Sequence, residues 1–552
     1  MTIRLRWRMR DINFDQSQNC ATKDLQSEAV KSPSALNFTR LSERKIAAFA
    51  WLLCLFLVAA PFASLVIRLH YSVDSFNLIS DQRALWYLSL GRYTLYYLTL
   101  FVDFIGLNLV LDQRIFLALC IFALATSIYI VSRLFARLLN STNKYLILFL
   151  CVPTSLIWVN VFIVDLLLFP EAAIEVTVGS LSVSAAACFS LKDGRVGHVV
   201  LSALFLLIAL GCYQSYVGFF VSITLIGTFL KYKDISVKAM LTSWIRSIVV
   251  GLLCCLINVF LIRFFVVSGI VSDSGRGASL SISSIFANLL STIEYQIPLW
   301  TNADGLMPPF VMPLLFLLCV GCVLFASARM TSIKLRFLYF LAIGMSYLAA
   351  FSAHYVEAQV FFTPRSNIAV WCVVGCVLAS SAGILKSHLN ASGSHLRSSS
   401  NEVGFLRKAA LMLFLMTGFV YAVSAYTIID IAYDKYCNNI QDFNYATAVA
   451  ERIQEYEDET GNIVDSIVCK RDVSAEITYP GVRYDCYELG WKIMLTDYSN
   501  WQLVNFVGGL DLQPVSDEAG LWDTFFGGKD WINLNLDEQL VIQDNVAYLA
   551  LY

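Results

Sequence analysis

Long apolar segments alternate with short polar connections from residue 46 to residue 430. The segments 46–67 and 409–429 are each long enough, at a rise of about 1.5 Å per residue, to cross the roughly 30 Å of hydrocarbon in a bilayer. The pattern predicts an α-helical polytopic membrane protein with about eleven transmembrane helices. These are expected at 46–67, 114–136, 145–163, 171–190, 196–211, 214–230, 241–267, 308–327, 334–353, 365–385 and 408–429.

The apolar run from Val199 to Leu230 is too long for one helix and short for two. It contains a polar pause at residues 211–215, Gly-Cys-Tyr-Gln-Ser. Because a chain reversal at that depth needs polar partners, the pause favours a tight turn between two helices. One kinked helix is the alternative, and it would place the rest of the chain on the other side of the membrane.

Residues 69–113 are neither a plain loop nor a clean span. Leu85, Trp86 and Leu88, followed by Tyr96 and Tyr97, suit short amphipathic helices. Aromatic rings favour the headgroup level of a bilayer. We therefore expect two short helices lying at the membrane surface in this first outer loop.

After residue 430 the pattern becomes that of a soluble domain. Apolar residues at helical spacing predict a helix over 445–456, and β-prone runs predict strands at 463–468 and within 539–552. A small α/β domain over 431–552 is long enough to form its own modest core.

Three parts are therefore expected: a cytoplasmic N-terminal segment 1–45, a transmembrane domain 46–430 that includes the first outer loop 69–113, and the α/β domain 431–552. The first ten residues are rich in arginine, but no signal-peptide core with a cleavage site follows them. The first span is therefore expected to act as an uncleaved signal-anchor.

Composition agrees with a membrane location. Hydrophobic residues make up 58% of the chain and charged residues 14%, which is more apolar surface than a soluble fold of 552 residues can bury. The net charge of −2 conceals an acidic tail, since residues 431–552 hold 21 Asp and Glu against 7 Lys and Arg. An acidic tail argues against nucleic acid as a partner, because phosphate binding needs a basic surface.

The cations predict an orientation. With eleven crossings, Lys and Arg gather in alternate connections, which the positive-inside rule assigns to the cytoplasm. These connections lie near 133–144, 192–195, 231–238, 329–336 and 386–408. The N-terminus is then cytoplasmic, and the acidic tail lies on the opposite side.

Cysteine placement gives little evidence of a disulfide framework. Twelve of the fifteen cysteines fall in the N-terminal segment or in apolar spans. Cys437, Cys469 and Cys486 remain in the tail. Cys469 and Cys486 could close a disulfide in an oxidising compartment, and two reduced, buried thiols are the alternative.

Motifs of soluble nucleotide-dependent or metal-dependent enzymes are absent from the sequence: it has no Walker loop, no dinucleotide glycine pattern following a strand, no HExxH and no two CxxC motifs at the spacing of a metal site. Ionisable residues gather instead at the outer ends of the predicted spans, where burial is costly without a partner or ligand. Asp74 lies just after the first span, near headgroup height. No cofactor is expected; Asp74, Asp81 and Glu171 could share a divalent cation, but their spacing does not require one.

Four short segments carry a family resemblance: 73–77 (Val-Asp-Ser-Phe-Asn), 90–92 (Leu-Gly-Arg), 212–215 (Cys-Tyr-Gln-Ser) and 442–453. Together with the layout of spans, acidic first loop and outer C-terminal domain, they resemble the GT-C class of integral-membrane glycosyltransferases. More particularly, they resemble the serotype-converting O-antigen glucosyltransferases of the Gtr type. Where many relatives carry adjacent carboxylates in the first loop, this chain has Asp74 and Asp81, so either could be the base.

The resemblance implies transfer of a hexose, glucose in particular, from an undecaprenyl-phosphate-linked donor to lipopolysaccharide O-antigen. It implies a bacterial inner-membrane protein working at the periplasmic face, together with a donor-synthesising transferase and a donor flippase. An acceptor hydroxyl needs a carboxylate to take its proton, and Asp74 is the candidate. A phosphate leaving group needs a fixed cation, for which Arg365 and then Arg92 are the candidates.

Further residues could contact the sugar or the acceptor: Tyr213, Gln214, Glu171 and His354. His354, with Glu357 close by, could alternatively be the base of a membrane acyltransferase, although a structural histidine is the simpler interpretation. Two other functions share this architecture. A lipid-linked sugar flippase would need inverted repeats and charges near midspan, neither of which is evident. An O-antigen polymerase cannot be separated from a transferase by sequence alone.

Overall fold

The computed structural model describes residues 33–80, 84–139, 145–192, 194–275, 281–330, 332–358, 360–394, 400–517 and 520–552. Its chain separates into two units between Lys45 and Ile46, the position at which the sequence places the start of the transmembrane domain.

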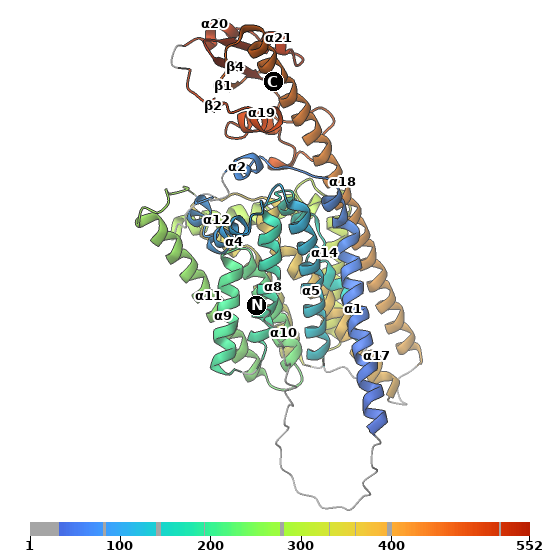
Figure 1. Ribbon diagram of the computed structural model, residues 1–552. Helices are drawn as coiled ribbons and strands as arrows, with labels where there is room; N and C mark the ends of the chain where they lie inside the picture. The colour runs from blue at the N-terminus through green and yellow to red at the C-terminus, as the bar shows by residue number, and fades with distance from the viewer. Residues whose placement is uncertain are drawn as a thin grey trace, which may run out of the picture. The chain divides into compact units, whose positions relative to one another are not determined.

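Eight helices within the described residues are long and apolar enough to cross a membrane (Figure 1). Their outer faces carry exposed apolar side chains; on α11, for example, Ile245, Leu252 and Phe260 are exposed. The chain is therefore a multi-pass membrane protein. The eight are α1 (Pro33–Ile67), α5 (Gln113–Leu138), α8 (Ala172–Ser190), α11 (Val237–Val267), α14 (Val311–Ala328), α15 (Ile333–Ala350), α17 (Ala369–Ser394) and α18 (Ser400–Thr460).

Three shorter apolar helices occupy the remaining predicted spans: α6 (Leu146–Ser155), α9 (Val196–Leu210) and α10 (Tyr216–Tyr232). The single span expected at 145–163 is wrong, because a second short helix, α7 (Val161–Leu167), follows α6. Asn160 starts it by accepting the backbone N–H groups of Phe162 and Ile163 at 3.1 and 3.2 Å, which is an N-cap. The sequence pattern missed this break because both short helices are apolar.

The predicted turn at 211–215 is confirmed, since α9 ends at Leu210 and α10 begins at Tyr216. The carbonyl of Gly211 accepts the N–H groups of Thr94 and Leu95 at 2.9 and 3.2 Å. A Cβ on Gly211 would lie 2.3 Å from the Thr94 hydroxyl oxygen, so only glycine allows this approach. The turn therefore supports the beginning of the surface helix α4.

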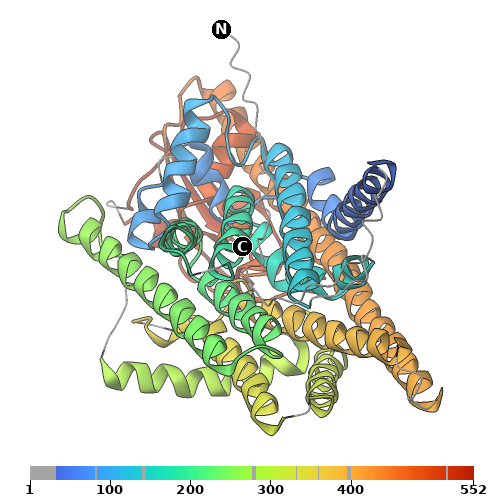
Figure 2. The same cartoon turned by 90° about the horizontal axis from the view of Figure 1, so that it is seen from below.

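The first loop forms short helices, as predicted: α2 (Ser75–Ser80), α3 (Trp86–Ser89) and α4 (Tyr93–Phe104). α4 exposes Tyr97, Phe101 and Phe104 and buries Leu95 and Val102, so it is amphipathic. Figure 1 places α2 and α4 at the end of the membrane helices that carries the C-terminal domain. A second amphipathic helix, α12 (Ile282–Glu294), lies with α11 at the edge of the helix assembly (Figure 2).

The C-terminal domain contains a four-stranded sheet in the order β2-β1-β4-β3. β1 is parallel to both neighbours, and β3 and β4 form an antiparallel pair. The predicted strands at 463–468 and within 539–552 are thus found, and the predicted helix at 445–456 is the last part of α18. The strands are β1 (Ser466–Arg471), β2 (Gln513–Pro514), β3 (Leu540–Gln543) and β4 (Val546–Leu551).

Short helices complete the structure, and α18 connects its two main parts. The predicted domain boundary at 430 falls inside α18, which continues without interruption from the apolar region into the C-terminal domain. The short helices are α13 (Gln296–Asn302), α16 (Ser352–Tyr355), η1 (Pro364–Asn367), η2 (Tyr487–Leu489), η3 (Ile493–Leu495), α19 (Asn500–Gly508), α20 (Trp522–Phe526) and α21 (Leu536–Gln539).

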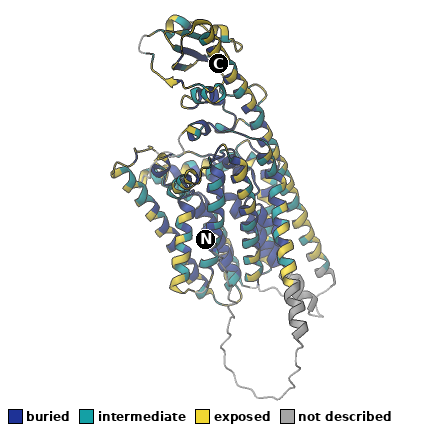
Figure 3. Ribbon diagram, viewed as in Figure 1, coloured by how far each residue is buried: buried dark blue, intermediate teal, exposed yellow. Residues whose placement is uncertain are grey.

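The first loop packs directly on the C-terminal domain. The Phe76 ring lies 6.0 Å from that of Phe443 and 5.5 Å from that of Phe506, between centroids. Asn439 on α18 accepts the Tyr71 N–H at 2.8 Å and donates to the Tyr71 carbonyl at 3.1 Å. Buried residues continue from the membrane helices into this contact (Figure 3). The loop and the domain therefore form one packed body.

The disulfide considered for Cys469 and Cys486 is wrong, because both are free thiols. Cys469 packs against the apolar core of the C-terminal domain, whereas Cys486 belongs to the core of the membrane helices. The two thiols lie in different apolar clusters, so the alternative of two reduced cysteines holds.

Candidate active site

A cavity of about 390 Å³ lies where the first loop, the membrane helices and the C-terminal domain meet. Four of the residues predicted from the sequence line it, namely Asp74, Arg92, Glu171 and Arg365. Glu175, Glu488 and Tyr498 line it as well. The cavity thus collects carboxylates and arginines from segments far apart in the chain.

Asp74 immediately precedes α2 and is partly buried. Its carboxylate oxygen Oδ1 accepts the hydroxyl of Tyr498 at 3.0 Å, and its backbone N–H donates to Ser72 Oγ at 3.1 Å. Burial raises the pKa of Asp74, and the negative charge of Glu488 raises it further. The hydrogen bond from Tyr498 acts in the opposite direction and favours the ionised carboxylate.

Glu171 precedes the first residue of α8 and is 4% exposed. Its oxygen Oε2 has no hydrogen-bond partner among the described residues. Burial, and then the charge of Asp74, raise the pKa of Glu171 to about 8. At neutral pH this side chain is therefore mainly a neutral carboxylic acid that can donate a hydrogen bond into the cavity.

Arg92 lies between α3 and α4. Its Nη1 is 3.7 Å from Glu175 Oε2, and its Cζ lies 4.8 Å from the centre of the Tyr213 ring. Gln214 donates from Nε2 to the carbonyl of Leu90, close to Arg92 in the chain. Tyr213 and Gln214 do not line the cavity, and their contacts place them behind Arg92.

Arg365 belongs to η1 at the start of the α17 span. Its Nη2 contacts Glu488 Oε2 at 2.6 Å, and its Nη1 lies 3.7 Å from Asp165 Oδ1. Its backbone N–H donates to Asp165 Oδ2 at 2.9 Å, and its Cζ lies 4.5 Å from the centre of the Phe169 ring. The guanidinium is therefore held from two sides by carboxylates.

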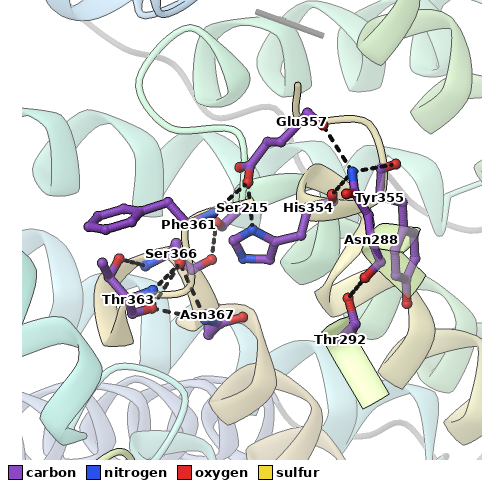
Figure 4. Close-up of polar contacts among 10 residues, drawn as sticks. All are labelled: Ser215, Asn288, Thr292, His354, Tyr355, Glu357, Phe361, Thr363, Ser366 and Asn367. Atoms are coloured by element: carbon purple, nitrogen blue, oxygen red, sulfur yellow. Dashed lines mark hydrogen bonds and ion pairs between the residues drawn. The ribbon is translucent and has the colours of Figure 1, made fainter. Parts of the chain in front are cut away.

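A capping network fixes η1 (Figure 4). Thr363 Oγ1 accepts the Ser366 N–H at 3.3 Å, and Ser366 Oγ accepts the Thr363 N–H at 3.0 Å. This reciprocal pair is a capping box. Ser215, just before α10, donates to the Ser366 carbonyl at 2.6 Å. The turn at 211–215 therefore supports Arg365 through η1 as well as Arg92 through α4.

His354 does not line the cavity. It lies beside Glu357 and Asn288, on the segment that precedes η1 (Figure 4). Its Nδ1 lies 3.0 Å from Glu357 Oε2. Asn288 on α12 donates to the carbonyls of His354 and Glu357 at 3.1 and 2.9 Å. Asn288 thus joins α12 to the segment that leads to η1, and the geometry gives His354 a structural setting. Asp81 lies outside the described residues.

Buried polar atoms around the cavity lack hydrogen-bond partners within the described chain. Such atoms carry a cost unless a ligand or water completes them, so their concentration here indicates a binding site. Within the described residues no three His, Cys, Asp or Glu side chains are grouped to hold a metal ion. The atoms are Tyr87 OH, Arg92 Nε, Glu171 Oε2, both carboxylate oxygens of Glu175, and Arg365 Nη1.

Sequence reasoning did not assign Glu175, Glu488 or Tyr498 to the site. Glu175 could have been found, because it follows Glu171 by four residues and so lies on the same helix face. Glu488 and Tyr498 carried no such signal. They come from the C-terminal domain, which the sequence pattern treats as separate from the membrane helices.

Residues 63–379 match the family model described as glucosyl transferase GtrII. The match covers more than half of the 552 residues and includes Asp74, Arg92, Glu171 and Arg365. The chain belongs to the GtrII glucosyltransferase family. The resemblance read from the sequence is confirmed, and glycosyl transfer is the chemistry of the family. In this GtrII protein, Glu488 and Tyr498 lie beyond the matched region.

Two solved structures are similar to this GtrII protein. One is the archaeal oligosaccharyltransferase AglB from Archaeoglobus fulgidus, in complex with an inhibitory peptide and a dolichol-phosphate. Its TM-score is 0.42 at 11% sequence identity, and the alignment covers 86% of this chain and 64% of that one. The other is the apo form of an oligosaccharyltransferase from the same organism, with a TM-score of 0.42 at 11% sequence identity. That alignment covers 87% of this chain and 65% of the other. This chain therefore spans less than two thirds of the length of either. No protein of curated function matches it.

Proposed function

We propose that the protein transfers a glucosyl group from undecaprenyl-phosphate-glucose to the O-antigen of lipopolysaccharide, at the periplasmic face of a bacterial inner membrane. The observation that carries the proposal is the cavity. It holds a partly buried carboxylate, Asp74, together with two arginines, at the end of the membrane helices, in a member of a glucosyltransferase family.

The arginines suit a lipid-linked phosphate. Arg92 Nε and Arg365 Nη1 are buried and have no hydrogen-bond partner among the described residues. A phosphodiester oxygen would satisfy them through charge-assisted hydrogen bonds, and the planar guanidinium can bind two oxygens at once. As the bond to the sugar breaks, the phosphate gains negative charge, which these fixed cations stabilise.

Asp74 is the proposed base of a single displacement. The acceptor hydroxyl oxygen attacks the anomeric carbon while the carbon–oxygen bond to the phosphate breaks, and that electron pair leaves with the phosphate. The hydroxyl proton passes to the Asp74 carboxylate. Glu171, neutral at pH 7, would donate a hydrogen bond to a sugar hydroxyl or a phosphate oxygen.

The charge distribution supports a non-cytoplasmic cavity. α8 starts beside Glu171 at the cavity and is followed at its far end by Lys192, about 28 Å away at 1.5 Å per residue. α10 starts beside Ser215 and carries Lys231 in its last turn. The Lys231 ammonium donates to the Leu191 carbonyl at 2.8 Å, so these far ends meet. Lysines at the end remote from the cavity favour that end as cytoplasmic.

Two other functions lead to different observations. A flippase would move the lipid-linked sugar without forming a new glycosidic bond, and a polymerase would lengthen O-antigen without changing the mass of its repeat. The placement of the charged groups in an end cavity rather than at midspan favours transfer over transport.

The test supplies the purified protein with undecaprenyl-phosphate-glucose and O-antigen lipopolysaccharide. We expect each modified repeat to gain the mass of one hexose, measured by mass spectrometry. Asp74→Asn is expected to lower the rate by about 10²–10⁴-fold at unchanged protein level, the range typical of general-base removal.

Asp103→Asn is the matched control, because Asp103 is also an aspartate of the first loop but is exposed and outside the cavity. Its activity should equal that of the unmodified protein. Full activity in Asp74→Asn would remove Asp74 as the base. Lengthened O-antigen with an unchanged repeat mass would identify a polymerase instead.

A further inference from the structure

Two residues of the C-terminal domain contact the groups to which the proposed reaction assigns its main steps. Glu488 on η2 reaches the Arg365 guanidinium, with 2.6 Å between Nη2 and Oε2. Tyr498, just before α19, donates its hydroxyl to Asp74 at 3.0 Å. Both contacts join residues distant in sequence, by 123 and 424 positions. The domain therefore completes the cavity.

The contact between Glu488 and Arg365 conflicts with phosphate binding. Nη2 of Arg365 is paired with Glu488, and the Arg365 side chain is only 13% exposed. A phosphate that approaches Arg365 from the cavity meets the negative charge of Glu488 at the same place. In a buried site, two like charges beside one cation repel strongly. Glu488 and a phosphate therefore compete for Arg365.

The charge balance of the cavity leads to the same conclusion. Asp74, Glu175 and Glu488 are carboxylates, and Arg92 and Arg365 are the cations among the lining residues described. Arg92 is already near Glu175, and Arg365 is also bound by Asp165. An anionic donor adds a further negative charge. The unpartnered Arg92 Nε and Arg365 Nη1 can each bind a phosphate oxygen, and the phosphate gains more if one carboxylate also gives up its arginine.

Glu488 is the carboxylate best placed to do so. Asp165 accepts the backbone N–H of Arg365 in addition to the ion pair, so it is tied to η1. Glu488 touches Arg365 through its side chain alone and belongs to a single three-residue turn, η2, anchored by Lys435, whose ammonium donates to the Leu489 carbonyl at 3.3 Å. Rotation of the Glu488 side chain frees Arg365 without disturbing that anchor.

We infer that Glu488 is a displaceable counter-ion: it neutralises Arg365 until the phosphate of the lipid-linked donor takes its place. This inference rests on the proposed function. It makes the C-terminal domain part of the donor site, and it predicts that Glu488 weakens donor binding. If the ion pair between Glu488 and Arg365 were purely structural, substitution of Glu488 would weaken donor binding instead.

The experiment measures binding of undecaprenyl phosphate to the purified full-length protein in detergent. Glu488→Gln is expected to bind it about tenfold more tightly, which corresponds to ~1.4 kcal/mol. Arg365→Gln is expected to bind it more weakly. In the double variant, Glu488→Gln should have no further effect, because the competition requires Arg365. Glu538→Gln, an exposed glutamate of the same domain, is the control and should bind like the unmodified protein.

The outcomes separate the two proposals. Unchanged or weaker binding in Glu488→Gln, with weaker binding in Arg365→Gln, would overturn the exchange but leave the donor site intact. Unchanged binding in Arg365→Gln would count against the phosphate site itself. If Glu488→Gln does not fold, Glu488→Asp keeps the charge but shortens its reach. Undecaprenyl phosphate should then bind Glu488→Asp more tightly than the unmodified protein, and unchanged or weaker binding would contradict the exchange.

Discussion

At the scale of single residues, the carboxyl groups of Asp74 and Glu171 line the same cavity but have different electrostatic surroundings. Burial and the charge of Glu488 raise the pKa of Asp74, whereas the hydrogen bond from Tyr498 and the charges of Arg365 and Arg92 act against that rise and favour the ionised form. Glu171 has an unpaired Oε2, and burial with the charge of Asp74 raises its pKa to about 8. When the surroundings of two neighbouring carboxyl groups push their pKa values apart, one group commonly acts as the base and the other as a neutral hydrogen-bond donor.

The pH dependence of the rate tests this division. Glu171 is protonated at pH 7 and ionises as pH rises through about 8, which adds a negative charge beside Asp74. The transfer rate of the unmodified protein should therefore fall above about pH 8. Glu171→Gln cannot ionise, so it should keep most of its activity at pH 7 and lose that alkaline fall. The rate is measured as a function of pH across the pKa of about 8. An inactive Glu171→Gln at pH 7 would contradict the role of a neutral hydrogen-bond donor.

At the scale of elements, the start of α10 holds the segment that carries Arg365. Ser215 donates to the Ser366 carbonyl, and a Cβ on Gly218 would lie 2.6 Å from the Ala369 Cβ and 2.9 Å from the Ala350 Cα. Because the hydrophobic effect does not drive helices together within lipid, membrane helices associate through close packing, which small residues allow. The height of Arg365 in the cavity therefore depends on how closely α10, α15 and α17 pack.

Gly218→Leu should separate these helices. Overpacking of this kind costs about 1–3 kcal/mol of stability, and displacement of η1 should also raise the donor KM. Gly321→Leu on α14 is the control, because no atom lies within 4 Å of its added Cβ. Thermal unfolding of the purified proteins and donor titrations are the measurements. Equal stability in the two variants would contradict the packing argument.

At the scale of the whole molecule, a single helix carries the chain from the membrane region into the C-terminal domain. α18 contributes Asn439 to the first loop and Tyr445, Val449 and Ile453 to the core of the domain. The domain in turn supplies Glu488 and Tyr498 to the cavity. Domain, first loop and cavity must therefore lie on the same side of the membrane.

The proposed orientation can be measured with two cysteine substitutions at exposed aspartates. Asp530 lies in the C-terminal domain and Asp234 lies between α10 and α11, and each is replaced by cysteine in a separate variant, Asp530→Cys and Asp234→Cys. In right-side-out membrane vesicles, a membrane-impermeant maleimide should label position 530 and leave position 234 unlabelled until detergent is added. The unmodified chain measures the background from its own cysteines. The reverse labelling pattern would place the cavity in the cytoplasm.

The sequence by itself determined most of the helices and the strands of the C-terminal domain. Apolar spans, the turn at 211–215 and the short helices of the first loop all follow from hydrophobic patterning, which depends on neighbours in the chain. It also indicated Asp74, Arg92, Glu171 and Arg365, because ionisable side chains at span ends are costly without a role. It did not show that α6 and α7 are separate or that α18 is continuous, since apolar patterning does not mark such junctions.

Only the tertiary structure decided which of these side chains meet. Arg365 joins Asp74 through the packing of η1 against α7 and α10, while Tyr213 and Gln214 turn out to support Arg92 and His354 lies elsewhere. Glu488 and Tyr498 enter the cavity from a domain with a different local pattern. Contacts across hundreds of residues depend on how whole elements pack, and a local pattern carries no information about them.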